Sequence, residues 1–340
     1  MLPLVSILIP AYNAERWLRS AIVSALNQTW PRREVIVVDD GSTDNTVAVA
    51  QAYESSGVKV VSQRHSGASA ARNRALALSQ GDYVQWLDAD DVLAPDKIER
   101  QLTCPEIRED PWTLGSSAWG FFYRDPSQTI LNPTELWSSL APGEWLYRKC
   151  DRNVWMAVET WLVSKQLCDA AGIWNEELLR DNDGEYFCRI LRKAKKVHFV
   201  PESLVCVRRG VATSISNSST LSRRKLESIM KSLHCHIDCL LALENSERTK
   251  AAGVKMLQRH LIYFYPEHPD LVDEAKRAAA SLGGRLIDPE LGSYYRVVKK
   301  LAGFKVAKRI MFRRRRSYKI LGLLKELIAA RGERKEMLTV

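Results

Sequence analysis

Several features that would assign this chain of 340 residues to a common class of protein are missing from it. No run approaches the roughly 18 uncharged apolar residues of a membrane-spanning helix. The opening residues MLPLVSILIP lack the basic segment of a secretory signal, and they predict a buried first strand. The seven cysteines are an odd count, and without an export signal they favour a reduced, cytosolic setting over a disulfide framework.

Two further absences narrow the function. The first strand is followed by PAYN (10–13) and not by the glycine-rich G-x-G-x-x-G loop that binds nicotinamide and flavin dinucleotides. Acidic residues are missing between Leu291 and Lys325, a stretch with twelve lysines and arginines. The net charge of +10 is therefore a property of this tail, since +10 minus +12 leaves about −2 for the remainder.

The first hundred residues alternate between strand-like and helix-like segments. Strands are expected at 5–10, 34–40, 58–61 and 82–87, and helices at 14–27, 43–55 and 66–79. This alternation predicts parallel strands joined by right-handed crossovers, and ligands of such sheets bind at the carboxyl ends of the strands. The polar groups PAYN (10–13), DDGS (39–42) and DADD (88–91) all stand at those ends.

The rest of the chain changes character twice. Residues 95–203 show short strand and helix signals and are rich in tryptophan, and the pattern from 221 onward predicts mainly helix. Between them, VATSISNSST (211–220) is a polar connector that predicts a domain boundary. The segment HCHIDC (234–239) has two cysteines and two histidines. So compressed on one helix, they favour helix packing over a tetrahedral zinc site.

The DADD segment crowds Asp88, Asp90 and Asp91 together directly after an apolar strand. Like charges this close resist ionising together, and a divalent cation would remove the repulsion. Mg²⁺ and Mn²⁺ take one or two carboxylates together with substrate phosphates. The alternative is that Asp90 or Asp91 caps a helix that begins near Pro95. The strand end and the two companion loops favour the cation.

The companion loops each have two interpretations. A carboxylate in VVDDGSTD (37–44) can accept hydrogen bonds from a base or a ribose, but the same residues form turns and caps. In SGASAARN (66–73), Gly67 lets the backbone approach a ligand and Arg72 can meet a phosphate. The alternative there is an alanine-rich helix packed on the sheet. Tyr12 can stack on a base.

In this order and at these spacings, VSILIPAYN, VIVVDDGSTD, SGASAARN and GDYVQWLDADD resemble the motifs of family 2 glycosyltransferases, which have the GT-A fold. The resemblance is dense over residues 4–101 and weaker to about 210. It implies an α/β fold, with a Rossmann-like, mostly parallel sheet flanked by helices. The GT-A domain would span 1–210, with a donor half (1–101) and an acceptor half (102–210). A helical C-terminal region (221–340) with a basic tail (295–325) would follow.

The resemblance also implies an activity and a donor site. Such enzymes move a sugar from a nucleotide-sugar, usually UDP-linked, to a hydroxyl acceptor with inversion. Residues expected to bind the donor are Pro10, Ala11, Tyr12, Asn13, Asp40, Gly67, Arg72, Asp88 and Ala89. Asp40 would hold the uracil. Asp88 and Asp90 would hold Mn²⁺ or Mg²⁺, with Asp90 as the direct ligand, so that the leaving diphosphate is neutralised.

An inverting transfer needs a general base for the acceptor hydroxyl. The family carries it in an acidic Glu-Asp segment before a helix, and WNEELLRDNDGEYFCRI (174–190) occupies that place. The alignment puts Asp183 on the base and Asn182 where Glu is common, with Asp181 and Glu185 as rivals. The alternative is an acidic helix start favoured by the helix dipole. Because Asn182 departs from the family pattern, a non-catalytic nucleotide- or glycan-binding module stays open as a second hypothesis.

Two expectations concern other parts of the acceptor half. Glu159 and Trp161 are expected on the acceptor side. Arg208 and Arg209 would reach the donor phosphates when a lid closes, unless they are surface arginines.

The basic tail would lie on an anionic membrane, unless it is merely solvated. The residues facing lipid would be Val297, Leu301, Phe304, Met311 and Phe312. No nucleic-acid reader motif accompanies the tail, so no nucleic acid is expected. The protein is expected in the cytoplasm, peripheral on the inner face of the membrane, with a glycan or lipid-linked acceptor.

Overall fold

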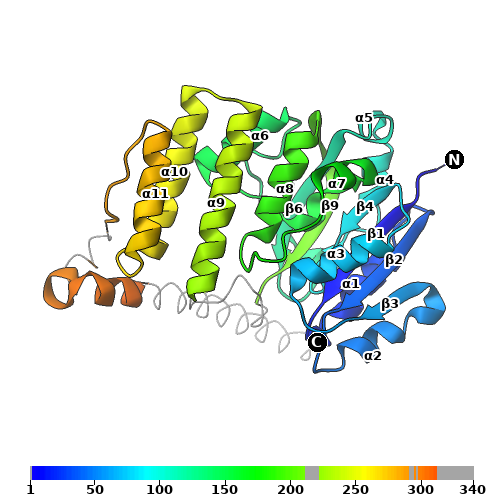
Figure 1. Ribbon diagram of the computed structural model, residues 1–340. Coiled ribbons are helices and arrows are strands. Elements are labelled where there is room, and N and C mark those ends of the chain that lie inside the picture. The colour runs from blue at the N-terminus through cyan, green and yellow to red at the C-terminus, as the bar shows by residue number, and fades with distance from the viewer. Residues whose placement is uncertain (1, 211–221, 291–294, 296–297, 312–340) are drawn as a thin grey trace, which may run out of the picture.

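The computed structural model describes residues 2–210, 222–290, 295 and 298–311. Figure 1 shows a twisted sheet flanked by helices, with a row of long helices beside it. The strand order among the described residues is β3-β2-β1-β4-β8-β6-β9-β5, with β7 paired to β6. The α/β fold expected from the sequence is therefore confirmed.

The donor half supplies four parallel strands. They are β1 (Val5–Ala11), β2 (Arg33–Asp39), β3 (Val58–Ser62) and β4 (Tyr83–Trp86). The crossovers hold α1 (Leu18–Leu26), α2 (Thr46–Gln51), the short η1 (Glu54–Ser56) and α3 (Ala68–Leu78). β1 lies at the centre, and Ile7, Leu8 and Ile9 are all fully buried because helices cover both faces. The carboxyl ends of all four strands meet at one edge.

Beyond β4 the sheet becomes mixed. It contains β5 (Val92–Leu93), β6 (Thr113–Phe122), β7 (Ile130–Leu131), β8 (Leu162–Ser164) and β9 (Lys196–Arg208). β8 is antiparallel to β4, and β6 is parallel to β9. β5 pairs with β9, with Val92 opposite Cys206, and this register brings Arg208 next to the DADD segment. The parallel character predicted for the sheet belongs mainly to the donor half.

The helices of the acceptor half lie around these strands. They are α4 (Lys97–Leu102), α5 (Pro105–Arg108), α6 (Pro142–Arg152), α7 (Lys165–Ala171) and α8 (Asn182–Lys193), with the short η2 (Pro126–Gln128) and η3 (Val158–Thr160). Aromatic contacts fix α8 against the end of β4. Trp174 stacks on Tyr186 of α8 at 4.1 Å and meets Trp86 of β4 edge-on at 5.2 Å. Such pairs contribute about 0.5–1.5 kcal/mol each beyond the area they bury.

The C-terminal region begins with α9 (Arg223–Leu243), α10 (Glu247–Phe264) and α11 (Pro269–Ser281). Figure 1 shows α9 directly beside α8. Buried apolar residues of these helices belong to the same continuous hydrophobic cluster as the strands. The predicted boundary at 211–220 lies outside the described residues, and the residues on its two sides share one hydrophobic core.

Residues 298–311 are helical, and two of them correct the expected membrane face. Phe304 meets Tyr265 edge-on at 5.0 Å, and Met311 is 8% exposed, so both side chains face the protein. Leu301 is 84% exposed. Val297 and Phe312 lie outside the described residues. Among the helices that the structure describes, none has the length and apolar character to cross a membrane.

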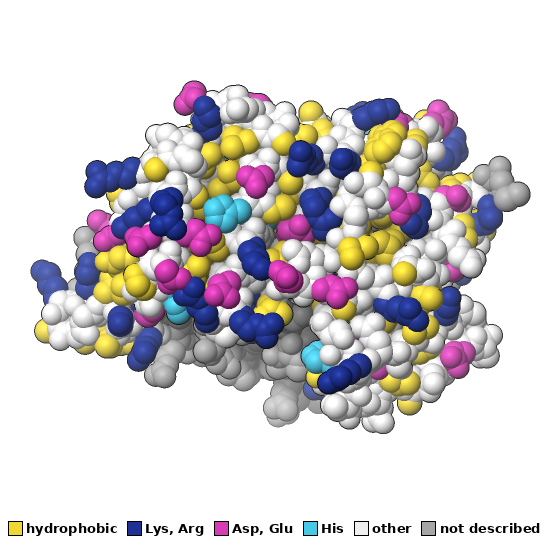
Figure 2. Space-filling view, viewed as in Figure 1, with side chains coloured by type: hydrophobic (Ala, Val, Ile, Leu, Met, Phe, Trp, Pro, Cys, Tyr) yellow, Lys and Arg dark blue, Asp and Glu magenta, His cyan; other side chains and the backbone are white. Residues whose placement is uncertain are grey.

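The side chains of HCHIDC contact several different neighbours. His234 lies 2.9 Å from Glu274 of α11, and His236 lies 2.6 Å from Lys149 of α6. This is the helix packing that the sequence favoured over a zinc site. Figure 2 shows basic and acidic side chains interspersed over the visible face of these helices, in line with a net charge that belongs to the tail.

Candidate active site

Asp40, the expected uracil ligand, is 2% exposed at the end of β2. Its carboxylate accepts hydrogen bonds from the backbone N–H groups of Ser66 (2.9 Å) and Gly67 (2.8 Å) and from the side chain of Gln63 (2.8 Å). His65 Nδ1 lies 2.9 Å from the same carboxylate. A carboxylate accepts about four hydrogen bonds, so a base N–H reaches Asp40 only if one donor withdraws. The side chain of His65 is 56% exposed, so His65 is the donor that can withdraw from Asp40.

The PAYN loop lies beside this carboxylate. Pro10 and Ala11 end β1, and Tyr12 stacks on His65 with ring centroids 4.2 Å apart. Asn13 has a positive φ of 48° and donates its backbone N–H to Ser42 Oγ (2.9 Å), which ties the loop to the one after β2. The Tyr12 ring is 46% exposed, as a base-stacking surface requires.

Arg72 of α3 points to the carboxyl end of β4. It is 6% exposed and pairs with Asp88 at 2.8 Å. Its guanidinium also lies over the Trp174 ring at 4.5 Å. Gly67 precedes α3 with a φ of 100°, a value that favours glycine. Apart from its chain neighbours, no atom of the described residues lies within 4 Å of the place where a Cβ of residue 67 would stand, so a ligand can approach the backbone there. The structure thus brings together Arg72 and Asp88, two residues that the sequence placed at the donor from different motifs.

An acidic group lies at the end of β4. Asp88, Asp91 and Glu159 place carboxylate oxygens within 4.8 Å of one another. Glu159 is 1% exposed and accepts the backbone N–H of Asp88 at 3.3 Å. Burial and the charge of Asp88 raise the pKa of Glu159 to about 8. Burial and the neighbouring carboxylates also raise the pKa of Asp91. Clustered hard oxygen donors of this kind suit Mg²⁺ or Mn²⁺.

Asp90 is not part of that group of three, although the sequence predicted it as the direct ligand. Burial and Asp88 raise its pKa to about 6, so it shares the same repulsive environment. Ala89, expected at the donor, is half-buried between them. The helix α4 begins at Lys97 with Asp96 before it, so neither Asp90 nor Asp91 caps that helix. The capping alternative is therefore wrong.

The two arginines at the end of β9 have different surroundings. Arg208 is 9% exposed, and its backbone N–H donates to Asp91 at 2.6 Å while Nε donates to the carbonyl of Asp90 at 2.9 Å. Arg208 is therefore packed against Asp90 and Asp91 and is not a surface arginine. Arg209 is exposed and lies over the Phe121 ring. The connector from residue 211, which would form the lid, lies outside the described residues.

The three acidic candidates for the base differ in their partners. Glu185 is 7% exposed and is paired with Arg189 at 2.7 Å. Asp181 accepts a hydrogen bond from Ser232 Oγ at 2.5 Å. Within the described residues, the carboxylate of Asp183 has no ion pair and no hydrogen bond to another side chain; its backbone N–H donates to Asn182 Oδ1 at 2.9 Å. Burial and Asp181 raise the pKa of Asp183 above its ordinary value, with Arg72 opposing this. Asp183 is thus the carboxylate most available to take a proton.

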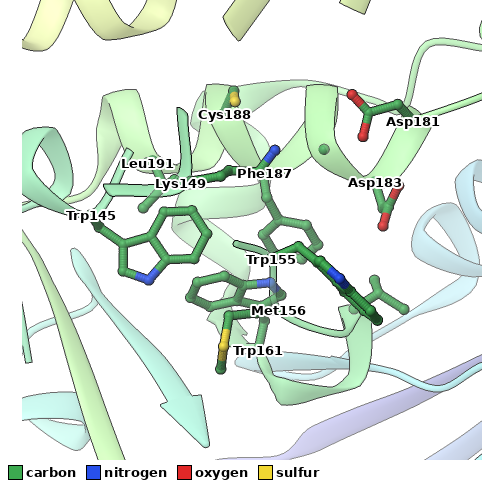
Figure 3. Close-up of a pocket in the computed structure, with 12 residues that line it drawn as sticks. Trp145, Lys149, Trp155, Met156, Trp161, Asp181, Asp183, Phe187, Cys188 and Leu191 are labelled. Atoms are coloured by element: carbon green, nitrogen blue, oxygen red, sulfur yellow. The ribbon is translucent and has the colours of Figure 1, made fainter. Parts of the chain in front are cut away.

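A cavity of about 50 Å³ lies beside Asp183. Figure 3 shows Asp181 and Asp183 at one side of it and the rings of Trp155, Trp161 and Phe187 around it. Trp161, expected on the acceptor side, is 2% exposed and stacks on Phe187 at 5.1 Å. Trp155 is 47% exposed and had not been predicted as a site residue. The cavity thus places aromatic rings beside Asp183.

The match to known families covers the donor half. Residues 6–104 match the family model described as glycosyl transferase family 2. This chain carries a family 2 glycosyltransferase domain. The matched range includes all four motifs around Asp40, Arg72 and Asp88, and it excludes Glu159 and α8.

Several curated proteins share this domain. The chain is 45% identical over 103 residues to the putative teichuronic acid biosynthesis glycosyltransferase TuaG of Bacillus subtilis, covering 29% of this chain and 41% of TuaG. It is 31% identical over 188 residues to the uncharacterized glycosyltransferase YibD of Escherichia coli, covering 52% and 54%. It is 44% identical over 110 residues to an Escherichia coli chondroitin synthase, covering 32% and 16%. The chain therefore spans about half or less of these relatives.

A solved structure extends the likeness beyond the family 2 domain. S. aureus TarS 1-349 in complex with UDP-GlcNAc superposes with a TM-score of 0.66 and 17% sequence identity. The superposition covers 82% of this chain and 81% of that one. At this identity the likeness establishes the fold, which includes most of the region that the family match leaves out.

Proposed function

We propose that this chain is an inverting glycosyltransferase that moves a sugar from a UDP-linked donor to a hydroxyl acceptor. The observation that carries the proposal is the position of Arg72. It pairs with Asp88 of the acidic group, and its charge also acts on Asp183. The donor loops and the candidate base thus converge on one buried guanidinium, as a single displacement between two substrates requires.

The donor would lie across the carboxyl ends of β1, β2 and β4. Tyr12 would stack on the base, and Asp40 would accept from the uracil once His65 turns away. The choice of UDP is supported by the TarS structures, which contain UDP and UDP-GlcNAc. Arg72 would exchange its pairing with Asp88 for the diphosphate, since guanidinium groups bind phosphate oxygens in bidentate fashion.

The acidic group fits a divalent cation, Mn²⁺ or Mg²⁺. Asp88 and Asp90 would hold it, with Asp91 and Glu159 as adjacent carboxylates. Burial and then repulsion by Asp88 raise the pKa values of Asp90 and Glu159, and a cation offsets that repulsion. When bound, the cation supplies charge neutralisation for the leaving diphosphate.

Asp183 would act as the general base. The acceptor oxygen attacks the anomeric carbon, its proton passes to the Asp183 carboxylate, and the bond from that carbon to the diphosphate oxygen breaks with the electron pair leaving on the diphosphate. One displacement inverts the anomeric configuration. The aromatic cavity beside Asp183 would contact the acceptor, because tryptophan rings pack well on the apolar faces of sugars.

The acceptor would be a growing polysaccharide or a lipid-linked glycan of the cell surface. The names of TuaG and of chondroitin synthase, which share the domain, support this class. The basic tail would hold the protein on the anionic cytoplasmic face of a membrane, where such acceptors are presented.

The activity is tested by incubating the full-length chain with a panel of UDP-sugars and Mn²⁺ and measuring release of UDP. The expected result is release of UDP from one donor, and this release is lost when the metal is chelated. The anomeric proton signal of the product should show the configuration opposite to that of the donor sugar. UDP binding without release from any donor, in the presence of hydroxyl acceptors, would favour the non-catalytic binding module.

Replacing Trp155 with alanine is expected to raise the KM for the acceptor by about tenfold, because an exposed ring of the cavity is lost. UDP affinity should not change, since the ring of Trp155 packs on Trp119 and Phe121 of β6 and not on Tyr12 or Asp40. Ile130→Ala is the control, because Ile130 is 67% exposed on β7 and does not line the cavity. An unchanged acceptor KM for Trp155→Ala would show that the cavity does not contact the acceptor.

Deleting residues 312–340 tests the membrane surface without removing Phe304 and Met311. The deletion takes away the RRRR run at 313–316. Each basic residue near an anionic surface contributes about 1 kcal/mol, so partitioning to phosphatidylglycerol vesicles should fall by at least about tenfold. Phosphatidylcholine vesicles are the control. Equal partitioning of the full-length and shortened chains to the anionic vesicles would show that residues 312–340 do not bind the membrane.

A further inference from the structure

One face of α9 carries three buried polar side chains in a row. Ser228, Ser232 and His236 are spaced by four residues and therefore lie above one another. Their exposures are 2%, 0% and 1%. Buried polar groups need hydrogen-bond partners. Ser228 and Ser232 bond the turn before α8, and His236 Nε2 lies 3.8 Å from Asp181 Oδ2 in that turn. We call Ser228, Ser232 and His236 the α9 polar stripe.

The first two members hold the turn that precedes α8. Ser228 Oγ accepts the backbone N–H groups of Leu179 (2.9 Å) and Arg180 (3.0 Å), and it lies 3.1 Å from the carbonyl of Arg180, to which its O–H can donate. Ser232 Oγ donates to Asp181 Oδ2 at 2.5 Å. Three consecutive residues of the turn are thus bonded to one helix face.

Asp181 needs this support because of its backbone. Its φ of 55° lies in the left-handed region, which is sparsely populated by residues other than glycine, asparagine and aspartate. Its carboxylate sits over Gly184, where any Cβ would collide with it. Figure 3 shows Asp183 next to Asp181 at the beginning of the same helix. The direction in which the Asp183 side chain leaves the helix is therefore set by the conformation at Asp181.

His236 connects the stripe to a third helix. Its Nδ1 lies 2.7 Å from the carbonyl of Ser232, which can only accept, so Nδ1 carries the proton. Its Nε2 lies 2.6 Å from Lys149 Nζ, an ammonium that can only donate, so Nε2 offers its lone pair. The two contacts define the neutral tautomer of His236, with the proton on Nδ1. They also hold the charged Lys149 beside the cavity. Lys149 lines the cavity together with Asp181 and Asp183.

We propose that the α9 polar stripe positions the general base, so that a helix outside the matched family 2 domain completes the active site. The inference rests on the proposed function for the role of Asp183. Ser228, Ser232 and His236 are positioning residues: they touch the turn and Lys149, and they act on the substrate only through Asp183.

A purely stabilising role explains the stripe less well. Apolar residues of α9 such as Leu226, Leu233 and Leu240 already hold this helix in the common hydrophobic cluster. Buried hydrogen bonds add little net stability compared with apolar groups of the same shape. A row of polar groups on this face is better explained by the need to fix one conformation of the turn.

Ser232→Ala tests the proposal, with Ser232→Thr as the conservative variant that retains a hydroxyl. His236→Gln tests the link to Lys149, and His234→Gln is the matched control, because His234 lies on the same helix but faces Glu274 of α11. The readouts are kcat and KM for UDP-sugar turnover, the UDP dissociation constant in Mn²⁺, the Tm, and hydrogen exchange of the amides at 179–185.

We expect kcat to fall by about 10- to 100-fold in Ser232→Ala and His236→Gln, since misplacing a catalytic group by about 1 Å costs about that much. UDP affinity and donor KM should stay within about twofold. Exchange at 179–185 should quicken, Ser232→Thr should recover most of the rate, and His234→Gln should match the wild type.

Three results would overturn the proposal: a wild-type kcat in Ser232→Ala, an equal loss in His234→Gln, or a loss confined to donor affinity. A Ser232→Ala protein that no longer unfolds cooperatively would also overturn it, since the fold itself would then need the stripe. If the wild-type chain turns over no donor, the proposed function fails. Faster hydrogen exchange at 179–185 in the stripe variants would then still show that the stripe holds the turn. The two failures are thus distinguishable.

Discussion

Replacing Asp183 with asparagine is expected to lower kcat for sugar transfer by about 10²- to 10⁴-fold, the usual contribution of a general base. The amide keeps the shape of the side chain but cannot take the acceptor proton. UDP affinity in the presence of Mn²⁺ should remain within about twofold of the wild type, because Asp183 lies on the first turn of α8, whereas Tyr12 and Asp40, the residues proposed to hold the uracil, lie at the ends of β1 and β2. Steady-state kinetics and calorimetry measure the two effects.

The pH profile gives this prediction a second readout. Burial and the neighbouring Asp181 raise the pKa of Asp183 above the ordinary aspartate value of 3.8. The base acts only when deprotonated, so the wild-type rate should fall as the pH drops through that raised pKa. Asp238→Asn is the control, since Asp238 is exposed on α9. Normal turnover by Asp183→Asn would show that the base has been assigned to the wrong residue.

Replacing Asp90 with alanine is expected to weaken metal-dependent UDP binding by at least about a hundredfold, or about 2.7 kcal/mol at 1.36 kcal/mol per tenfold change. The diphosphate and the remaining carboxylates carry like charges. Without a firmly held cation, they repel one another. Calorimetry of UDP with Mn²⁺ measures the loss. Asp96→Asn is a matched control from the same segment, because Asp96 pairs with Arg100 at the surface.

The same titrations separate two arrangements of the cation. The family resemblance names Asp88 and Asp90, whereas the structure groups Asp88 with Asp91 and Glu159. If Asp90→Ala binds UDP and Mn²⁺ as the wild type does, and Asp91→Ala or Glu159→Ala does not, then the cation belongs to the group of three and Asp90 is not its ligand.

The donor half could be predicted from the sequence because its signals are local. An apolar run followed by a polar turn gives each strand and its end, and β1, β2, β3 and β4 all fall within about two residues of the expected limits. The helices start later than expected. α2 begins at Thr46 because Asp44 accepts the N–H of Thr46 (3.0 Å) and Glu15 bonds Asn45, which keeps 43–45 in a turn.

The remainder of the site depends on contacts between distant residues. Glu159 reaches Asp88 across 71 residues, and Ser232 reaches Asp181 across 51. Nothing in the local pattern around Ser232 separates a serine that faces the active site from one that faces solvent. Trp155 was indistinguishable from the other tryptophans of the acceptor half, most of which are buried in the core. Only the packing of α6, α8 and α9 identifies which of these residues lie beside Asp183.

The central claim is a nucleotide-sugar site at the carboxyl ends of the parallel strands, and calorimetry of UDP binding to the full-length chain tests it most directly. With Mn²⁺ present, the account predicts saturable binding of one UDP per chain, which disappears when the metal is chelated. Absence of UDP binding with either Mn²⁺ or Mg²⁺ would contradict it, because Tyr12, Asp40 and the acidic group would then not form a UDP-sugar site.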